Sequence, residues 1–314
     1  MGANVTPMTL RLSNDRIEIE ILPLGAALHS FLVRQPDGGR RNIVLSRPDP
    51  TTTDSSFFGA TVGRLANRVG GSRFVLDGVE HRLAPNEGGN QLHGGPGGFA
   101  VLTWEVAEAT AERIVLQLTS PDGDQGYPGT LRATATFSLL PDGAQLTYTA
   151  TTDAPTVVNL TAHPYFILGD GTIEDHVVAA PTGSFTPTDA ELIPTGEVRP
   201  TAGTAFDLRA GRVLGEAIEA ARAEGLARKG GIDQNLVIDG EGLREHVRLT
   251  GPAGTLVVRS DAPAVQLYSG EHLGRSGLAI EPQGYPDAPN HPNFPSVVLL
   301  PGGTYSTTTQ WIVG

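Results

Sequence analysis

The sequence predicts an all-β protein, a large antiparallel sandwich, on three observations. Apolar and polar residues alternate with a period of two through most of the chain. Short turns rich in Gly, Pro, Asn and Asp separate these segments, and the 314 residues include 40 Gly and 24 Pro. The strands also follow one another directly, without the helices that a parallel sheet requires. We expect one domain covering residues 1–314, because no linker or repeat divides the chain.

The first element is a hairpin over residues 10–21, in which Ile17, Ile19 and Ile21 alternate with glutamates after a turn at residues 13–15. Four further hairpins are predicted, at RFVLDGVEHRL (73–83), LRATATFSLLPDGAQLTYTATT (131–152), HVRLTGPAGTLVVRS (246–260) and VVLLPGGTYSTTTQWIV (297–313). Each contains a Gly, Pro or Asp turn between two alternating runs.

A single segment, near residues 213–228, has helical periodicity. Leu214, Ile218 and Ala221 fall on one face, and Gly230-Gly231 follows as a stop signal. We therefore expect one short helix in an otherwise all-β chain.

The composition excludes several classes of function. The formal net charge of −12 disfavours a nucleic-acid partner, which needs a cationic face. The absence of cysteine excludes disulfides and thiol nucleophiles. No apolar stretch approaches the roughly 20 residues of a membrane-spanning helix, and the N-terminus MGANVTPMTLRL lacks the pattern of a secretory leader. We expect a cytoplasmic monomer or homodimer whose partner is a small molecule, with neither nucleic acid nor membrane involved.

Four polar segments contain the residues suited to chemistry. They are residues 57–71 with Arg64 and Asn67, residues 86–99 with His93, residues 160–168 with His163, and residues 279–296 with Glu281. In a sheet protein, such loops and strand ends converge on one concave face. Glu281 follows an apolar run, an environment that raises the pKa of a carboxyl and suits it to act as a general base.

Each of these features also has a structural interpretation. Glycine-rich loops are common turns in all-β proteins. A single arginine such as Arg64 often pairs with a structural carboxylate or carbonyl, and most histidines are structural. The sequence contains no HExxH, GxSxG or GxxxxGK[ST] motif. The remaining histidines, arginine and carboxylates suit acid and base catalysis on a neutral polyol.

Together these segments resemble the aldose 1-epimerases, or mutarotases. The family pattern GR-x-ANR appears at residues 63–68, F-x-L-(D/N)-G at 74–78, and N-x-LHGG at 90–95. The resemblance continues through Gly98-Phe99, Trp104, DGDQGYPGTL (122–131), TTDAPTVVNLTAHPYF (151–166), GIDQNLVI (231–238), SGEHL (269–273), EPQ (281–283) and PNHPNFPSVVLLPGGTY (289–305). It spans nearly the whole chain in the family's order.

The resemblance implies a β-sandwich of the galactose mutarotase type, with one groove across a sheet. Glu281 matches the family's general base and His163 its general acid. The substrate-binding residues that it implies are Arg64, His93, Asp233 and Asn67. The implied reaction interconverts the α and β anomers of a free aldose by acid/base-catalysed ring opening, and it needs neither metal nor cofactor.

An acid role requires a proton on His163, and a nearby carboxylate would favour that charged form. Asp233 is the candidate for this carboxylate. The chain also carries Ala162 and Ile167 where the family has asparagines, so we expect a sugar preference different from that of a galactose mutarotase.

Three alternatives stay open at this point. An epimerase of a sugar phosphate would need an arginine cluster, for which Arg64, Arg68, Arg73 and Arg275 are available. A sugar-binding protein without turnover, and a polysaccharide lyase or glycoside hydrolase on a similar sandwich, are the others.

Overall fold

The computed structural model describes residues 9–53 and 55–314, and most of its regular structure is antiparallel β-strand. This confirms the predicted fold class. The N-terminal segment on which the expectation of no secretory leader depends lies largely outside the described residues. No helix in residues 9–53 and 55–314 is both long and apolar enough to cross a membrane.

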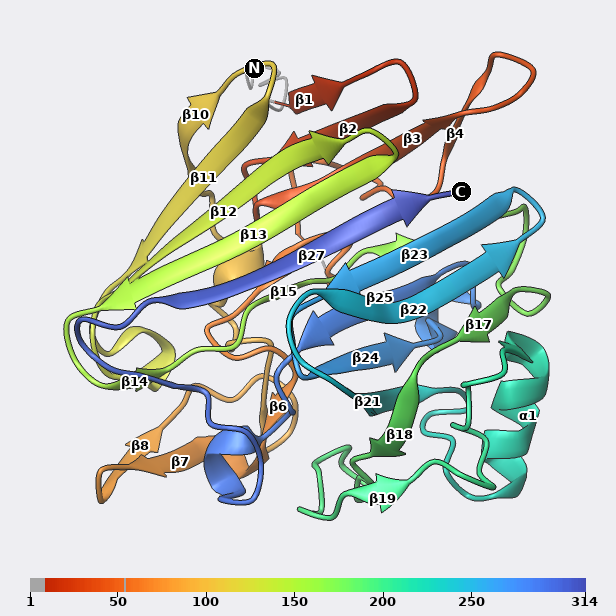
Figure 1. Ribbon diagram of the computed structural model, residues 1–314. Coiled ribbons are helices and arrows are strands. Elements are labelled where there is room, and N and C mark those ends of the chain that lie inside the picture. Colours follow the sequence, from red (N-terminus) through yellow and green to blue (C-terminus); the bar gives the residue numbers. More distant parts are fainter. Residues whose placement is uncertain (1–8, 54) are drawn as a thin grey trace, which may run out of the picture.

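The larger of the two main sheets has nine strands in the order β10-β11-β12-β13-β27-β23-β22-β17-β20 (Figure 1). Their bounds are β10 Glu105–Ala109, β11 Arg113–Ser120, β12 Leu131–Leu140, β13 Gly143–Thr152, β27 Tyr305–Val313, β23 Gly254–Ser260, β22 Arg244–Gly251, β17 Val177–Ala179 and β20 Arg212–Val213. The C-terminal strand β27 lies in the middle of this sheet, between β13 and β23. The long hairpins of the sequence therefore meet on the last strand of the chain.

The second sheet has six strands in the order β16-β25-β24-β21-β18-β19. Their bounds are β16 Tyr165–Phe166, β25 Leu278–Gln283, β24 Ala264–Tyr268, β21 Asp233–Ile238, β18 Thr182–Phe185 and β19 Arg199–Pro200. Successive side chains of a strand point to opposite faces of its sheet. In β25, Leu278 and Ile280 belong to the main core, whereas Glu281 belongs to the opposite face.

Smaller sheets and turns complete the described chain. A four-stranded sheet contains β1 Leu10–Ser13, β2 Ile17–Leu22, β3 Ala27–Arg34 and β4 Arg40–Asn42. Four two-stranded ladders pair β5 Thr61–Val62 with β15 Thr161–Ala162, β6 Arg68–Val69 with β9 Gln91–Leu92, β7 Arg73–Leu76 with β8 Val79–Arg82, and β14 Thr156–Val157 with β26 Val298–Leu299. Short 3₁₀ turns lie at Gly70–Ser72, Phe99–Val101, Asp124–Gly126, Glu271–Leu273 and Ala288–Asn290.

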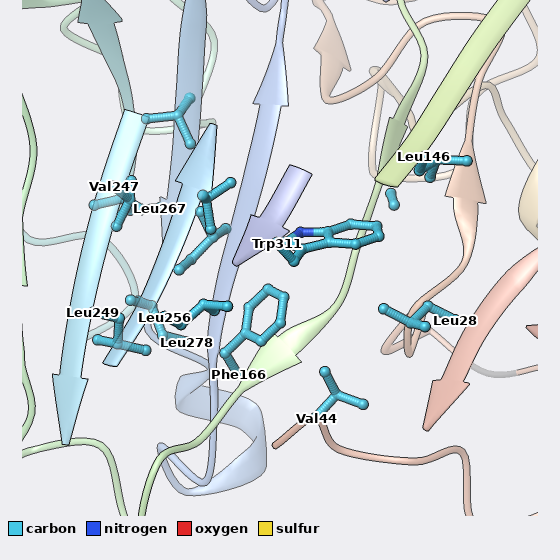
Figure 2. Close-up of a cluster of buried hydrophobic side chains, with 14 of the residues drawn as sticks. Leu28, Val44, Leu146, Phe166, Val247, Leu249, Leu256, Leu267, Leu278 and Trp311 are labelled. Atoms are coloured by element: carbon cyan, nitrogen blue, oxygen red, sulfur yellow. The ribbon is translucent and has the colours of Figure 1, made fainter. Parts of the chain in front are cut away.

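The main core includes side chains from both large sheets (Figure 2). Leu256 and Trp311 come from the nine-stranded sheet, and Phe166, Leu267 and Leu278 come from the six-stranded sheet. The rings of Phe166 and Trp311 lie 6.4 Å apart. Because each buried apolar side chain contributes roughly 1.5–3 kcal/mol, this packing fixes which face of the six-stranded sheet is apolar. The opposite face is left for polar residues.

Four of the five predicted hairpins are confirmed, at residues 10–21, 73–83, 131–152 and 246–260. The predicted hairpin at 297–313 is wrong. Its first strand, β26, pairs with β14, and its second, β27, pairs with β13 and β23. Alternation identifies both segments as strands, but it does not identify their partners, which are distant in sequence.

The predicted helix is confirmed as α1, Leu214–Ala223, with Leu214, Ile218 and Ala221 on its buried face. It ends earlier than the expected residue 228. Gly225, just beyond the C-cap Glu224, has a φ of 70°, the left-handed conformation that terminates many helices and that glycine adopts without steric cost.

Candidate active site

A cavity of about 260 Å³ lies on the face of the six-stranded sheet that points away from the main core. Five of the six site residues predicted from the sequence line it: His163, Glu281, His93, Asp233 and Asn67. The remaining lining residues are Ser55, Phe57, Arg68, Glu87, Leu92, Tyr165, Lys229, Tyr268 and His272. The structure therefore brings together residues from seven separate parts of the sequence.

Glu281 lies on β25 near the middle of the sheet, and only 1% of it is exposed. Its Oε1 lies 3.5 Å from Nε2 of His163, and its Oε2 has no hydrogen-bond partner among the described residues. Burial raises the pKa of Glu281 well above its ordinary value, and the negative charge of Asp233 raises it further, while Arg68 opposes the shift. Such a carboxyl binds a proton more strongly than an exposed one, which suits it to act as a general base.

His163 lies between β15 and β16, at the break in the strand that Pro164 produces. Its backbone N–H donates to the carbonyl of Ala60 (2.9 Å), and its carbonyl accepts from the N–H of Gly59 (3.0 Å). These bonds fix the backbone, and the ring packs 4.9 Å from that of Tyr165. Burial lowers the pKa of His163 to about 4.

The expectation that Asp233 would hold His163 as an imidazolium is wrong. Asp233 is 3.7 Å from Arg68 and raises the pKa of Glu281, whereas the carboxylate beside His163 is Glu281 itself. The pKa of Glu281 is raised and that of His163 is lowered, so their usual order is reversed. Burial thus favours the uncharged form of both groups, the carboxylic acid of Glu281 and the neutral imidazole of His163.

His93 is held as a hydrogen-bond donor by its neighbour Asn67. The backbone N–H of Asn67 donates to the ring nitrogen Nδ1 of His93 (3.1 Å). The backbone N–H of His93 donates in turn to the backbone carbonyl of Asn67 (3.0 Å). Because Nδ1 accepts a bond, the neutral ring carries its proton on Nε2. Burial lowers the pKa of His93 well below its ordinary value, so the ring stays neutral. A Cβ on the following Gly94 would lie 1.8 Å from the carbonyl oxygen of Gly63, so only glycine permits this close packing.

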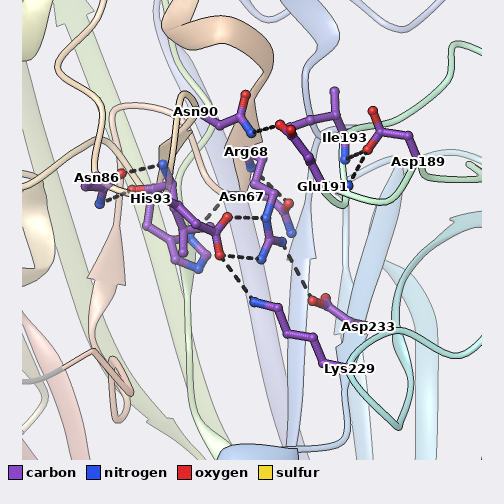
Figure 3. A network of polar contacts seen from close by, with 12 residues as sticks. Asn67, Arg68, Asn86, Asn90, His93, Asp189, Glu191, Ile193, Lys229 and Asp233 are labelled. Carbon is purple, nitrogen blue, oxygen red and sulfur yellow. Dashed lines mark hydrogen bonds and ion pairs between the residues drawn. The ribbon is translucent and has the colours of Figure 1, made fainter.

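Arg68 forms the centre of an ion-pair network near His93 (Figure 3). Its Nε and Nη2 donate to both oxygens of Glu87 (2.6 and 3.0 Å), and its Nη1 lies 3.7 Å from Oδ2 of Asp233. Gln266 donates to the other oxygen of Asp233 (2.5 Å), and Lys229 lies 3.5 Å from Glu87. The network fixes the Asp233 carboxylate at the wall of the cavity.

Comparison with known proteins identifies the family. The family model described as aldose 1-epimerase matches residues 8–311. The galactose mutarotase of Sus scrofa is 35% identical over 96% of this chain and 92% of its own length. The aldose 1-epimerase of Escherichia coli K12 is 35% identical over 97% of this chain and 94% of its own length. This chain belongs to the aldose 1-epimerase family.

Solved structures of the family share the fold of this epimerase. An aldose epimerase homologue from C. elegans superposes with a TM-score of 0.91 at 27% identity, covering 98% of this chain and 99% of that one. A galactose 1-epimerase from Lactobacillus acidophilus gives a TM-score of 0.86 at 27% identity, covering 100% and 96%. The predicted resemblance and the mutarotase type of sandwich are therefore confirmed. The family consists of isomerases that interconvert the anomers of an aldose.

Arg64 is the predicted site residue that the epimerase places elsewhere. It does not line the cavity, and 1% of it is exposed. Its guanidinium donates to the carbonyls of Ser120 (2.8 Å), Pro121 (2.8 Å) and Pro128 (3.0 Å) and to the hydroxyl of Ser120 (2.9 Å). All its donors are directed into the protein, so Arg64 ties loops together and is not available to a sugar.

The arginine that lines the cavity is Arg68, which the sequence reasoning left out of its site residues. Both arginines belong to the same motif, GRLANR, and the motif alone does not say which one is turned toward the cavity. Arg68 begins β6, which pairs with β9 immediately before His93. One feature of the sequence pointed to Arg68, because it directly follows the predicted site residue Asn67.

The two positions where the epimerase lacks asparagine do not line the cavity. Ala162 packs in the main core, and the N–H of Ile167 donates to the carbonyl of Ile43 (3.0 Å). Neither side chain is placed to contact a sugar directly. The predicted difference in sugar preference stays a prediction, and any effect of these positions would act through the backbone around His163.

The ligand atoms of His93, His163 and Glu281 lie within 4.8 Å of one another, close enough for a metal ion. The hydrogen bond from Asn67 argues against this use. It occupies Nδ1 of His93 and leaves the ring proton on Nε2, the nitrogen that would have to be free for a metal. The donor set is better suited to hydrogen bonding and proton transfer.

Proposed function

We propose that this epimerase acts on a free aldose, with Glu281 as the general base and His163 as the general acid. The observation that carries the proposal is the contact between these two buried groups, 3.5 Å from Nε2 to Oε1, with the pKa of Glu281 raised and that of His163 lowered by burial. Mutarotation requires one group that takes the proton of the anomeric hydroxyl and another that gives a proton to the ring oxygen, and the pair supplies both.

Ring opening begins with the pair as carboxylate and imidazolium. Glu281 removes the proton of the anomeric hydroxyl, the bond from C1 to the ring oxygen breaks, and C1 becomes the aldehyde carbon. His163 gives its proton to the ring oxygen, so the pair ends as carboxylic acid and neutral imidazole. That final state is the one that burial favours in both residues. Rotation about the bond from C1 to C2 and reversal of the same steps then give the other anomer.

The other residues at the cavity are proposed to hold the sugar. His93 offers Nε2–H as a donor, because its Nδ1 is occupied. Asp233 offers acceptor oxygens for a hydroxyl pair, and Arg68 offers a guanidinium next to it. Asn67 lines the same wall. Charged groups of this kind pair well with neighbouring hydroxyls, which both donate and accept.

The positions of the arginines favour a free aldose over a sugar phosphate. Of the four arginines considered for a phosphate, only Arg68 lines the cavity, and both oxygens of Glu87 already accept its hydrogen bonds. Arg64 is bound to buried carbonyls, Arg73 lies 3.8 Å from Glu80, and Arg275 pairs with Glu174 (2.5 Å). The two cations that line the cavity, Arg68 and Lys229, already pair with the carboxylates of Glu87 and Asp233, so neither offers a free positive charge to a phosphate.

Polarimetry tests the proposal. Freshly dissolved α-anomers of glucose, galactose and xylose should equilibrate faster with enzyme than without it, and glucose 6-phosphate should respond weakly. A large preference for the phosphate would contradict the free-aldose assignment. Binding of the sugars without any acceleration would identify a sugar-binding protein and remove the catalytic roles of Glu281 and His163.

Two further expectations stay predictions. The cytoplasm is the proposed location, and a monomer or homodimer is the proposed assembly, with a monosaccharide as the partner. The formal net charge of −12 supports the view that nucleic acid is not a partner. Fractionation of the native cells and light scattering on the purified chain would measure location and assembly.

A further inference from the structure

His272 lines the cavity of the candidate active site, and the proposed mechanism does not use it. The residue is exposed and belongs to the 3₁₀ turn Glu271–Leu273 that follows β24, so it lies at the mouth of the cavity. Its Nδ1 is hydrogen-bonded to the hydroxyl of Tyr268 (2.7 Å), and its Nε2 is hydrogen-bonded to the hydroxyl of Ser56 (3.1 Å). The imidazole therefore bridges β24 and a segment that lies 216 residues away in the sequence.

The bridge can form in every protonation state of the imidazole. Each hydroxyl can donate or accept a hydrogen bond. A neutral ring donates from one nitrogen and accepts at the other, and an imidazolium donates from both, so two hydroxyls suit all of these forms. The rings of His272 and Tyr268 are also nearly parallel, at 8° with centroids 5.7 Å apart. The connection therefore holds its two ends whether or not the histidine is charged.

Ser56 directly precedes an aromatic ring that packs on both catalytic-site histidines. Phe57 lines the cavity, and its ring lies 4.8 Å from that of His93 and 6.0 Å from that of His163. Phe57 has a φ of 54°, a left-handed conformation that a bulky residue keeps only where surrounding contacts hold it. The position of this ring therefore depends on the anchors on either side of it.

Both sides of Phe57 are anchored at the cavity. After it, the N–H of Gly59 donates to the carbonyl of His163 (3.0 Å). Before it, the hydroxyl of Ser56 is bonded to the imidazole of His272. The first anchor is a backbone bond that any side chain permits, whereas the second depends on the identity of residue 272.

We propose that His272 is a positioning residue for the acid–base pair of the proposed function. Its bridge to Ser56 holds the ring of Phe57 against His163 at the mouth of the cavity. The proposal rests on the assignment of Glu281 and His163 as that pair. The ring of Phe57 keeps water from His163, and burial is the main cause of its lowered pKa. Without the bridge, water reaches the imidazole and its pKa rises toward the ordinary value.

Other groups also act on the titration of His163. The titratable and charged groups around the pair include Glu281, Asp233, Arg68, His93, Tyr165 and His272. A charge on His272 lowers the pKa of His163, so removing that imidazole raises the pKa for an electrostatic reason as well. A test of the bridge must therefore include a variant that keeps the imidazole.

NMR titration of the imidazole signals measures the pKa of His163 whether or not the protein turns over a sugar. His272→Phe removes the bridge and the charge, and Ser56→Ala removes the bridge but keeps the imidazole. We expect both variants to raise this pKa from about 4 by about one unit or more. A rise of one unit stabilises the starting imidazolium about tenfold, so kcat should fall by up to about tenfold. KM should change little, because the residues proposed to hold the sugar are untouched.

His81→Phe is the matched control. The ring of His81, on β8, also stacks on an aromatic ring, that of Phe74 (5.2 Å, 27°), and it does not line the cavity. This variant should leave the pKa of His163 and kcat unchanged. A rise in His272→Phe without one in Ser56→Ala would assign the effect to the charge and overturn the proposal, as would an unchanged pKa in both. A wild type without mutarotation would refute the proposed function instead, because the NMR result is independent of turnover.

Discussion

Replacing either member of the buried pair, by Glu281→Gln or His163→Asn, should remove most of the mutarotase activity. Both substitutions keep the approximate shape of the side chain and remove its ability to carry the transferred proton. Nε2 of His163 and Oε1 of Glu281 lie 3.5 Å apart, so the two groups serve the same sugar molecule at the same moment. We expect the substitutions to act on turnover much more than on binding.

The magnitude follows from the coupling of the two proton transfers. General acid and general base contributions are each about 10²–10⁴-fold, so each single variant should lower kcat by at least about 10²-fold. Ring opening needs Glu281 to accept one proton and His163 to donate another in the same step, so losing either group stops the step. The double variant should therefore be within about tenfold of the slower single variant, far from the product of the two effects.

Polarimetry of a freshly dissolved α-anomer measures these rates, and thermal unfolding checks the fold. Burial raises the pKa of Glu281, so the wild type loses stability as the pH rises through that raised pKa, whereas the Gln variant does not. Glu281→Gln should thus be at least as stable as the wild type at neutral pH. Near-normal turnover in either single variant would remove that residue from its role. A double variant slowed by the full product would refute the coupling of the two proton transfers.

Three further predictions follow from the geometry of the site. Turnover against pH should be bell-shaped, because His163 takes up a second proton below about pH 4 and the pair loses its single proton above the raised pKa of Glu281. Asp233→Ala should act chiefly on KM, since holding a hydroxyl contributes to substrate and transition-state binding alike. Arg64→Met should lower the free energy of unfolding by about 3–5 kcal/mol, because it leaves buried carbonyls without donors, whereas Arg68→Met should raise KM.

Initial-rate polarimetry measures the pH and KM effects, and urea denaturation measures the stability of the arginine variants. A profile without an alkaline limb would contradict the one-proton state of the pair. An effect of Asp233→Ala confined to turnover would contradict its binding role. The two arginine variants serve as controls for each other, and an Arg64→Met protein as stable as the wild type would show that its buried hydrogen bonds contribute little.

Much of the fold could be predicted because the relevant signals are local. The turn at Asp77-Gly78 joins two strands that pair immediately, so alternation and turn chemistry are sufficient there. The face of α1 was predictable for the same reason. The closing segment differs, because β27 pairs with β13, which lies far away in the sequence. No local pattern distinguishes that pairing from a simple hairpin.

The candidate site was likewise predicted in part, with most of its residues identified correctly and one arginine wrongly. Motifs named His163, Glu281, His93, Asp233 and Asn67, and all five line one cavity. The same reasoning chose the wrong arginine of GRLANR, since a motif records spacing and does not record which side chain is buried against other loops.

The sequence by itself determined the antiparallel strands, the helix, the family and most of the residues that line the cavity. Only the tertiary structure decided the partners of β27, the separate positions of Arg64 and Arg68, and the protonation of the central pair. The physical reason is that strand pairing, hydrogen bonding and pKa depend on contacts between segments that are far apart in the chain. Glu281 and His163 acquire their displaced pKa values only when folding removes both from water.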